Sequence, residues 1–167
     1  MIAAFDVSYS GDGSAQAAAV VFENFTDAKP LRVYRKKIAH VAEYVPGSFY
    51  RRELPCILEL LAEIEEKIDV IIVDGYVTLG DRPGLGQHLS DSIDPDIAVI
   101  GVAKKYFEGS RPAEAIRGRS KKPLFVTSYG VEIDKARELI ESMHGKYRLP
   151  TLLKIVDRLS KEGLILC

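Results

Sequence analysis

The sequence predicts an α/β fold, in which a mixed β-sheet is flanked by helices. Its first forty residues contain three apolar stretches separated by turn residues, the pattern of an antiparallel meander. Short apolar runs then alternate with segments of helical periodicity, the pattern of parallel strands joined by crossing helices. A chain of 167 residues suits one domain, over residues 1–167, with a hydrophobic core of its own.

The three opening strands are predicted at residues 2–8, 15–25 and 31–40. The GDGS tetrapeptide at residues 11–14 supplies the turn residues between the first two strands. The third strand alternates only partly between apolar and polar side chains. We expect the three strands to pair as an antiparallel meander.

The following segments mix helical and strand patterns. Residues 49–67 have apolar side chains at helical spacing, and Pro55 is tolerated only in a first turn, so the helix should begin just before it. The runs DVIIVD at 69–74 and IAVIGVA at 97–103 are typical of strands buried on both faces. The remaining elements are a short strand at 124–128 and two helices, with apolar faces at Ile133, Ala136, Ile140 and Met143 and at Leu152, Val156 and Leu159.

Composition gives weaker information about partners and location. The chain has 23 basic and 24 acidic residues, so its net charge of -1 creates no global field for a polyanion, although a local basic stripe matters more. Cys56 lies in a helical pattern and Cys167 is the last residue, which favours reduced thiols and fits no zinc site. No secretory signal opens the sequence, and no apolar run approaches the ~20 residues of a membrane span. We therefore expect a cytoplasmic protein.

Three acidic residues lie in or beside apolar segments, where a charged carboxylate costs free energy because it loses water. Asp6 falls in the apolar first strand, Asp74 ends the DVIIVD run, and Glu53 lies in the first turn of the helix before that run. If the first and fourth strands are neighbours, these side chains converge at the sheet edge where α/β proteins place their sites. Each acid alone is equally well explained as a helix cap or a solvated strand end. Together they favour a metal site, because crowded carboxylates need a cation or protons, and oxygen ligands suit Mg²⁺ or Mn²⁺.

Two further features adjoin these acids. Lys104 and Lys105 follow the buried run at 97–103, where a lysine can neutralise a phosphate, although most lysines are simply solvated. The glycine-rich segment 75–89 lacks the third glycine of a dinucleotide-binding fingerprint. We interpret it as a loop that permits close approach of a ligand or of backbone.

Taken in order, these segments resemble the endonuclease V family. The resemblance covers nearly the whole chain and runs through FDVSY, YVPGSFYRRE, IIVDGY, GQHL, IGVAKK and RLPT. It implies a ribonuclease H-like fold and metal-dependent cleavage of a phosphodiester near deoxyinosine in DNA, or near inosine in RNA, in DNA repair. Asp6, Glu53 and Asp74 match the carboxylates that hold Mg²⁺ or Mn²⁺, and Lys104 matches the active-site lysine.

The same resemblance assigns substrate-binding residues. Tyr44, Pro46 and Gly47 match a loop that wedges into the duplex, where a ring and a rigid turn replace the stacking lost when a base flips out. Gly75 matches a position at which the base approaches the backbone closely. Arg51 or Arg52 is then available for a phosphate.

The sequence also departs from the family pattern. Gly80 or Asp81 stands where the family usually has a histidine after the Asp-Gly pair, and Val131 stands where a second histidine is usual. Valine neither binds a metal nor carries a proton. From this we expect slow cleavage that favours Mn²⁺, and a gain in rate from Val131→His.

Two alternatives remain at this point. One is a nucleic-acid-binding homologue whose cleavage is weak or altered. The other is a phosphoryl-transfer domain of the actin-like kinase group, suggested by the FDVSYSGDG stretch. That architecture needs two such domains, and 167 residues hold only one.

Overall fold

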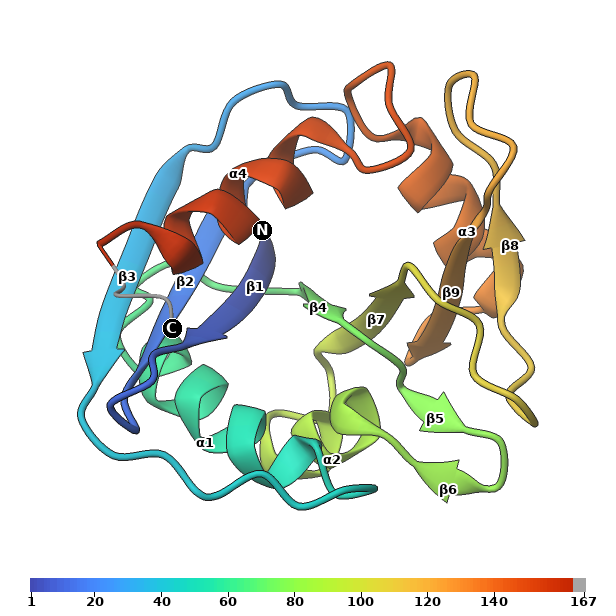
Figure 1. The fold of residues 1–167 in the computed structure, drawn as a ribbon. Helices are drawn as coiled ribbons and strands as arrows, with labels where there is room; N and C mark the ends of the chain where they lie inside the picture. The colour runs from blue at the N-terminus through green and yellow to red at the C-terminus, as the bar shows by residue number, and fades with distance from the viewer. Residues whose placement is uncertain (164–167) are drawn as a thin grey trace.

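The structure is a computed structural model that describes residues 1–163. Within these residues a seven-stranded sheet has the order β3-β2-β1-β4-β7-β9-β8 (Figure 1). Its strands are β1 Ile2–Tyr9, β2 Ala15–Phe22, β3 Arg32–Ile38, β4 Val70–Asp74, β7 Ala98–Ala103, β8 Ala113–Ala115 and β9 Leu124–Tyr129. The other elements are the hairpin strands β5 Thr78–Leu79 and β6 Arg82–Pro83 and the helices α1 Tyr50–Leu61, α2 Leu85–Ser92, α3 Ile133–Ser142 and α4 Thr151–Lys161.

The mixed sheet expected from the sequence is confirmed. Strands β1, β2 and β3 form the antiparallel meander, and β1 pairs with β4 and β4 with β7 in parallel. The first and fourth strands are therefore neighbours. Strand β9, by contrast, runs antiparallel to β7, because a hairpin with β8 rather than a crossing helix leads into it.

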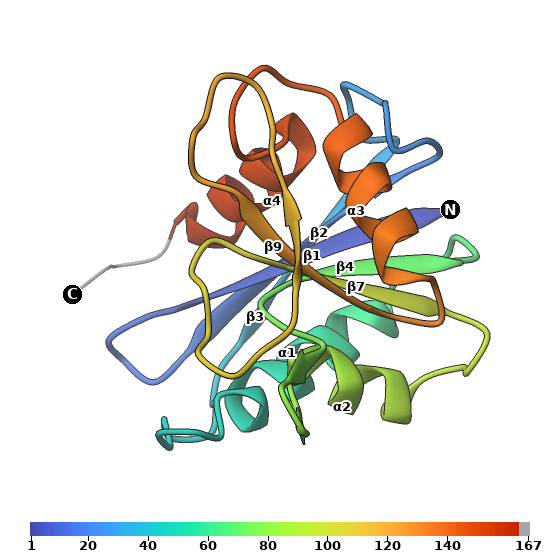
Figure 2. The ribbon, with the colours of Figure 1, turned by 90° about the vertical axis from the view of Figure 1, so that its right-hand side faces the viewer.

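Helices cover both faces of the sheet (Figure 2). On one face, α1 and α2 pack on the odd-numbered side chains of β1, including Ala3 and Phe5. On the other face, α3 and α4 pack on the even-numbered ones, including Ile2 and Ala4. Because side chains alternate along a strand, the position of a residue in β1 or β4 decides which helical layer it meets.

Helix α1 begins earlier than the sequence indicated. It starts at Tyr50, so Pro55 lies in the second turn and not the first. A proline there removes the bond that its N–H would donate to the carbonyl of Arg51. Both residues are exposed, so water can solvate that carbonyl, which explains why the helix continues through Pro55.

The glycine-rich segment contains a helix where we expected a loop. Helix α2 buries Leu85 and Leu89. Its first turn lies directly against the 76–77 backbone, because a Cβ on Gly84 would stand 2.5 Å from the Tyr76 carbonyl oxygen and one on Gly86 would stand 2.7 Å from Cγ2 of Val77. The expected close approach of backbone is thus present, but the assignment of residues 85–89 to a loop was wrong.

Two sequence expectations concern the cysteines and the membrane. Cys56 is buried in α1, at 1% exposure, while Cys167 lies outside the described residues. Across residues 1–163 there is no helix with the length and apolar character that crossing a membrane requires.

The contact between Gly86 and Val77 generates a first prediction. Gly86→Ala should lower the melting temperature, because a clash of about 1–3 kcal/mol outweighs the ~1 kcal/mol that alanine gains over glycine in a helix. Thermal unfolding followed by circular dichroism measures the change. Combining Gly86→Ala with Val77→Ala should be less destabilising than the sum of the two single changes. A Gly86→Ala variant more stable than the parent would contradict the packing described here.

Candidate active site

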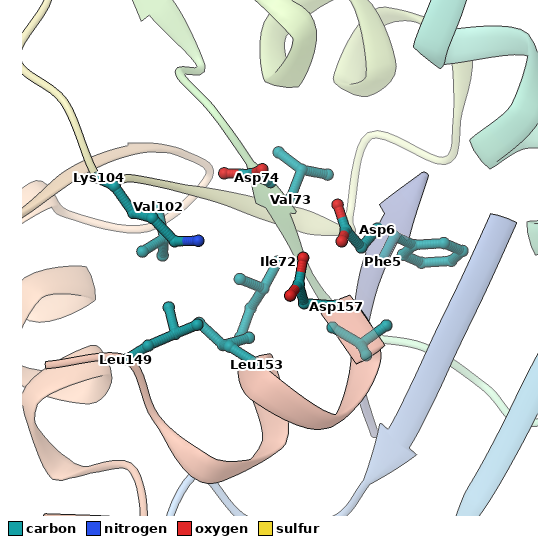
Figure 3. A pocket seen from close by; sticks show the side chains of 11 residues that line it. Phe5, Asp6, Ile72, Val73, Asp74, Val102, Lys104, Leu149, Leu153 and Asp157 are labelled. Carbon is teal, nitrogen blue, oxygen red and sulfur yellow. The ribbon is translucent and has the colours of Figure 1, made fainter. Parts of the chain in front are cut away.

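Three carboxylates and a lysine surround a pocket at the carboxyl ends of the parallel strands (Figure 3). Asp6 and Asp74 each lie two residues beyond the Ala4–Ile72 pair of β1 and β4, so they stand side by side on the α3–α4 face. Lys104 follows β7, and Asp157 projects from α4. The cavity between them has a volume of about 40 Å³.

Helix α4 is fixed against the meander by polar contacts near its C-terminus. The side-chain amide of Gln16 donates to the carbonyls of Leu159 and Glu162, both at 2.8 Å. The Ser160 hydroxyl lies 2.8 Å from that of Ser8 and donates to Asp6 Oδ2 at 3.1 Å. These contacts set the rotation of α4, and with it the position of Asp157 beside Asp6.

Asp6 and Asp157 form a hydrogen-bonded pair of acids. Burial, the Asp74 charge and the hydrogen bond to Asp157 raise the pKa of Asp6 to about 7. Burial also opposes ionisation of Asp157, but hydrogen bonds from Lys161 and from Asp6 outweigh it and lower the pKa of that carboxyl. Without a bound cation, Asp6 therefore carries the proton of the pair below about pH 7.

Asp74 keeps contact with solvent at the end of β4. The surrounding protein raises its pKa and Asp157 adds to the effect, while the ammonium groups of Lys104 and Lys161 lower it. Lys161 also forms an ion pair of 2.9 Å with Asp157. Two cationic side chains thus partly compensate the acids of this pocket.

Glu53 approaches the same charges from the α1 side. It is 3% exposed, and burial together with Asp74 and Asp6 raises its pKa well above the ordinary value. Its Oε2 has no hydrogen-bond partner among the described residues, and neither do the Tyr9 hydroxyl and the Arg52 Nε nearby. The Arg52 guanidinium instead lies 3.7 Å from the Tyr9 ring centroid. A buried carboxylate oxygen without a hydrogen-bond partner is a candidate ligand for a cation.

The residues present fit a hard divalent cation. Carboxylate oxygens are its preferred ligands, and an unpartnered, buried Glu53 oxygen beside two other acids gains most from one. Within residues 1–163, however, no group of three or more Asp, Glu, His or Cys side chains is placed to hold a metal. The shared ion of Asp6, Glu53 and Asp74 stays a prediction.

A second pocket adjoins the first through consecutive residues of one strand end. Asp74 lines the carboxylate pocket, and Gly75 lines a hollow of about 290 Å³ together with Tyr44 and Gly47. Tyr44 is 59% exposed, so the loop presents its ring to solvent. The further lining residues are Phe49, Tyr50, Tyr76, Leu79, Arg82, Pro83, Gly84, Leu85 and Phe107.

Two of the predicted substrate residues lie elsewhere. Pro46 is within the turn closed by the bond from Ser48 N to the Val45 carbonyl, at 2.9 Å, and does not line the hollow. Arg52 packs on Tyr9 behind Glu53 and is likewise absent from the lining, whereas Arg51 is exposed.

The structure corrects the expectation about the missing histidines. Val131 follows Tyr129, which pairs with Val99 near the start of β7, whereas Asp74 pairs with Val102 near its end. Val131 therefore lies at the opposite end of the sheet, and a histidine there would not reach the carboxylates. Gly80 packs on the Gly109 carbonyl oxygen, 2.7 Å from where a Cβ would stand, and has a positive φ of 66°. The expectation of slow cleavage assumed that Val131 lies in the active site, and that placement was wrong.

Comparison with known proteins identifies the chain. The family profile of endonuclease V matches residues 1–119, the part that carries Asp6, Glu53, Asp74 and Lys104. The chain belongs to the endonuclease V family. Endonuclease V of Nostoc punctiforme is 30% identical over 184 residues, which cover 95% of this chain and 81% of that protein. Members of the family are metal-dependent nucleases, so the actin-like kinase alternative is excluded.

Solved structures of the family share the ribonuclease H-like fold. The endonuclease V of Streptomyces avermitilis is 29% identical with a TM-score of 0.75, covering 97% of this chain and 80% of that one. The Ciona intestinalis endonuclease V, solved in complex with a 24mer DNA containing an inosine followed by a ribo-adenosine, has a TM-score of 0.80 at 20% identity. That comparison covers 96% of this chain and 84% of the other.

Sequence reasoning missed Asp157. One signal was available: Asp157 follows Val156 at the edge of the apolar stripe of α4, four residues after Leu153, and Ser160 interrupts that stripe with a buried hydroxyl. A buried polar residue beside an acid on an otherwise apolar helix face indicates a polar partner on the sheet below.

The raised pKa of Asp6 predicts how metal-free stability depends on pH. The folded state binds this proton more tightly than the unfolded chain does, so stability should fall as pH rises from about 4 to about 7. Asp6→Asn removes the cost of ionising a buried carboxyl. It should raise the free energy of unfolding by roughly 1–4 kcal/mol at pH 8.5, with little effect at pH 4.5. Urea unfolding in EDTA at both pH values measures this.

The matched control for that experiment is Asp81→Asn, which changes an exposed acid in the β5–β6 turn. In this control, the free energy of unfolding should differ between pH 4.5 and pH 8.5 by the same amount as in the parent. If Asp6→Asn changed the free energy of unfolding equally at both pH values, ionisation of Asp6 would cost no more in the folded state than in the unfolded chain.

Proposed function

We propose that this protein is a metal-dependent endonuclease that hydrolyses a phosphodiester bond near deoxyinosine in DNA, or near inosine in RNA, in DNA repair. The observation that carries the proposal is the junction at Asp74 and Gly75, where an acid of the carboxylate pocket is followed directly by a residue of the hollow beneath Tyr44. A base held in the hollow leaves its backbone next to the carboxylates. The Ciona intestinalis relative, solved with inosine-containing DNA, supports the choice of base.

In this proposal Asp6, Glu53 and Asp74 hold Mg²⁺ or Mn²⁺, and Asp157 adds a fourth carboxylate. The bound ion supplies Lewis-acid stabilisation of the phosphate charge and lowers the pKa of the attacking water. Lys104 lines the pocket and offers its ammonium group to the phosphate. Lys161 holds Asp157 in its ionised form.

The hollow suits a base that has left its stack. Aromatic side chains of Tyr44, Tyr50, Tyr76 and Phe107 surround it. Tyr76 is held in place because its hydroxyl donates to the Lys105 carbonyl at 2.6 Å and accepts from the Phe107 N–H at 3.0 Å. Gly75 has a φ of 121°, a backbone conformation that glycine adopts without strain, and it exposes backbone at the floor of the site. Stacking on such rings replaces the stacking lost in the duplex.

Incubation with oligonucleotides that contain one inosine tests this function directly. We expect cleavage with Mg²⁺ or Mn²⁺, none with EDTA, and a loss of about 10²-fold or more in Asp74→Asn and Asp157→Asn. The variant Asp96→Asn changes an exposed acid before β7, at the opposite end of the sheet, and serves as control, so it should cut like the parent. Binding of the inosine strand with no cutting under any metal would instead establish the nucleic-acid-binding alternative.

The exposed Tyr44 ring generates a separate prediction about recognition. Tyr44→Ala should weaken binding to an inosine-containing strand by roughly 5–100-fold, the loss of one stacked base, and should affect an inosine-free strand much less. Fluorescence anisotropy measures both affinities. Tyr129→Ala, which removes a ring 45% exposed at the far end of the sheet, is the control. Equal losses on both strands would mean that Tyr44 only contacts the backbone.

A further inference from the structure

A basic surface lies outside the site described above, on two loops beside α4. One loop joins β8 to β9 and the other joins α3 to α4, and the two run side by side in both views (Figures 1 and 2). Neither residues 115–131 nor residues 142–156 include an acid. Their exposed cations are Arg119, Lys121, Lys122, Lys146 and Lys154. Among residues 1–163, every ion pair lies elsewhere, so these charges have no carboxylate partner.

Two of these cations crowd the same aromatic ring. The Lys154 ammonium lies 3.8 Å from the centroid of Tyr147 and the Lys146 ammonium lies 5.5 Å from it. The ring itself is 56% exposed. A ring attracts each cation, but two like charges gathered on it repel each other, and an anion bound between them relieves that repulsion.

The loops are held rigidly in this arrangement. Arg117 is 4% exposed, and its guanidinium donates to the carbonyls of Met143, Gly145, Tyr147 and Arg148. The next residue, Gly118, touches the Lys146 carbonyl so closely that a Cβ there would stand 2.0 Å from its oxygen. A buried charge thus fixes the backbone that carries Lys146 and Tyr147, which lowers the entropy cost of binding a ligand.

The surface is concave and continues into the carboxylate pocket. A hollow of about 780 Å³ lies between Gly118, Arg119, Ser120, Lys146, Tyr147 and Arg148. Arg148 donates to the Pro123 carbonyl at 2.6 Å and also to the carbonyl of Lys104, while its neighbour Leu149 lines the carboxylate pocket with Lys104. The hollow beneath Tyr44 is lined instead by residues at the starts of α1 and α2, among them Tyr50 and Leu85, and these helices cover the other face of the sheet.

We propose that Arg119, Lys146 and Lys154 bind the phosphate backbone of the nucleic-acid strand on the side of the cleavage site away from the base. The inference rests on the proposed function for the identity of the substrate. A strand that enters the hollow beneath Tyr44 with its flipped base passes the carboxylates and Lys104. It then continues over Arg148 onto the basic surface, where phosphates lie against the lysines flanking Tyr147.

The test compares two double variants that remove the same charge. Lys146→Ala/Lys154→Ala changes the proposed surface, and Lys29→Ala/Lys37→Ala changes two exposed lysines beside and on β3, at the opposite edge of the sheet. Affinity for an inosine-free oligonucleotide is measured over a series of salt concentrations. Each lost phosphate contact lowers the absolute value of the slope of log K against log salt by about 0.7–0.9. We expect a reduction of about 1.4–1.8 for the first variant and none for the control.

The conservative variant Lys146→Arg/Lys154→Arg should restore the parent slope, which separates charge from any effect on folding. Equal slopes for the parent and the alanine variant, or equal reductions in the two alanine variants, would overturn the inference. So would a loss of inorganic phosphate binding with unchanged oligonucleotide binding, which would identify a site for a free anion. This measurement needs neither inosine nor cleavage. It therefore tests the basic surface even if the protein does not cleave near inosine.

Discussion

The carboxylates at the carboxyl ends of the central strands repel one another. The rest of the site depends on how the surrounding structure compensates for that repulsion. Asp6 and Glu53 have almost no solvent to screen them, so burial and mutual charge raise the pKa of both. A proton shared with Asp157 and the ammonium groups of Lys104 and Lys161 reduce the cost in the metal-free protein. A divalent ion would reduce the cost further, because it brings two positive charges to these carboxylates, including the unpartnered Oε2 of Glu53.

Such a site can exist only if the scaffold resists the repulsion. Asp6 pairs with Ala18 of β2 and Asp74 pairs with Val102 of β7, so neither backbone can move away from the site without breaking a strand ladder. Asp157 lies on a helix that Gln16 and Ser160 tie to the meander. The free energy that opposes the carboxylate charges comes from sheet pairing and from the burial of the two apolar layers.

The sheet also decides how the two binding regions are related. The hollow beneath Tyr44 faces the α1–α2 layer, and the basic surface around Tyr147 belongs to the α3–α4 layer, with the acids between them. A strand that contacts both regions has its backbone drawn across the carboxylates. Since the chain as a whole is nearly neutral, attraction of a polyanion depends on this local distribution of charge and not on the net value.

Local sequence pattern was sufficient for the central strands and for the residues attached to them. The apolar runs ending at Asp74 and before Lys104 are short and rich in Val and Ile, which is typical of strands buried on both faces, and their ends mark the site. Asp157, by contrast, looks like a solvated residue until α4 is docked on β1, and Val131 looks close to the site until β9 is seen to run antiparallel to β7. Helix α2 was hidden because its glycines serve contacts with the 76–77 backbone that no local pattern reveals. Hydrophobic periodicity records which face of an element is buried, but the partner of that face, and the direction from which it comes, is set by long-range packing.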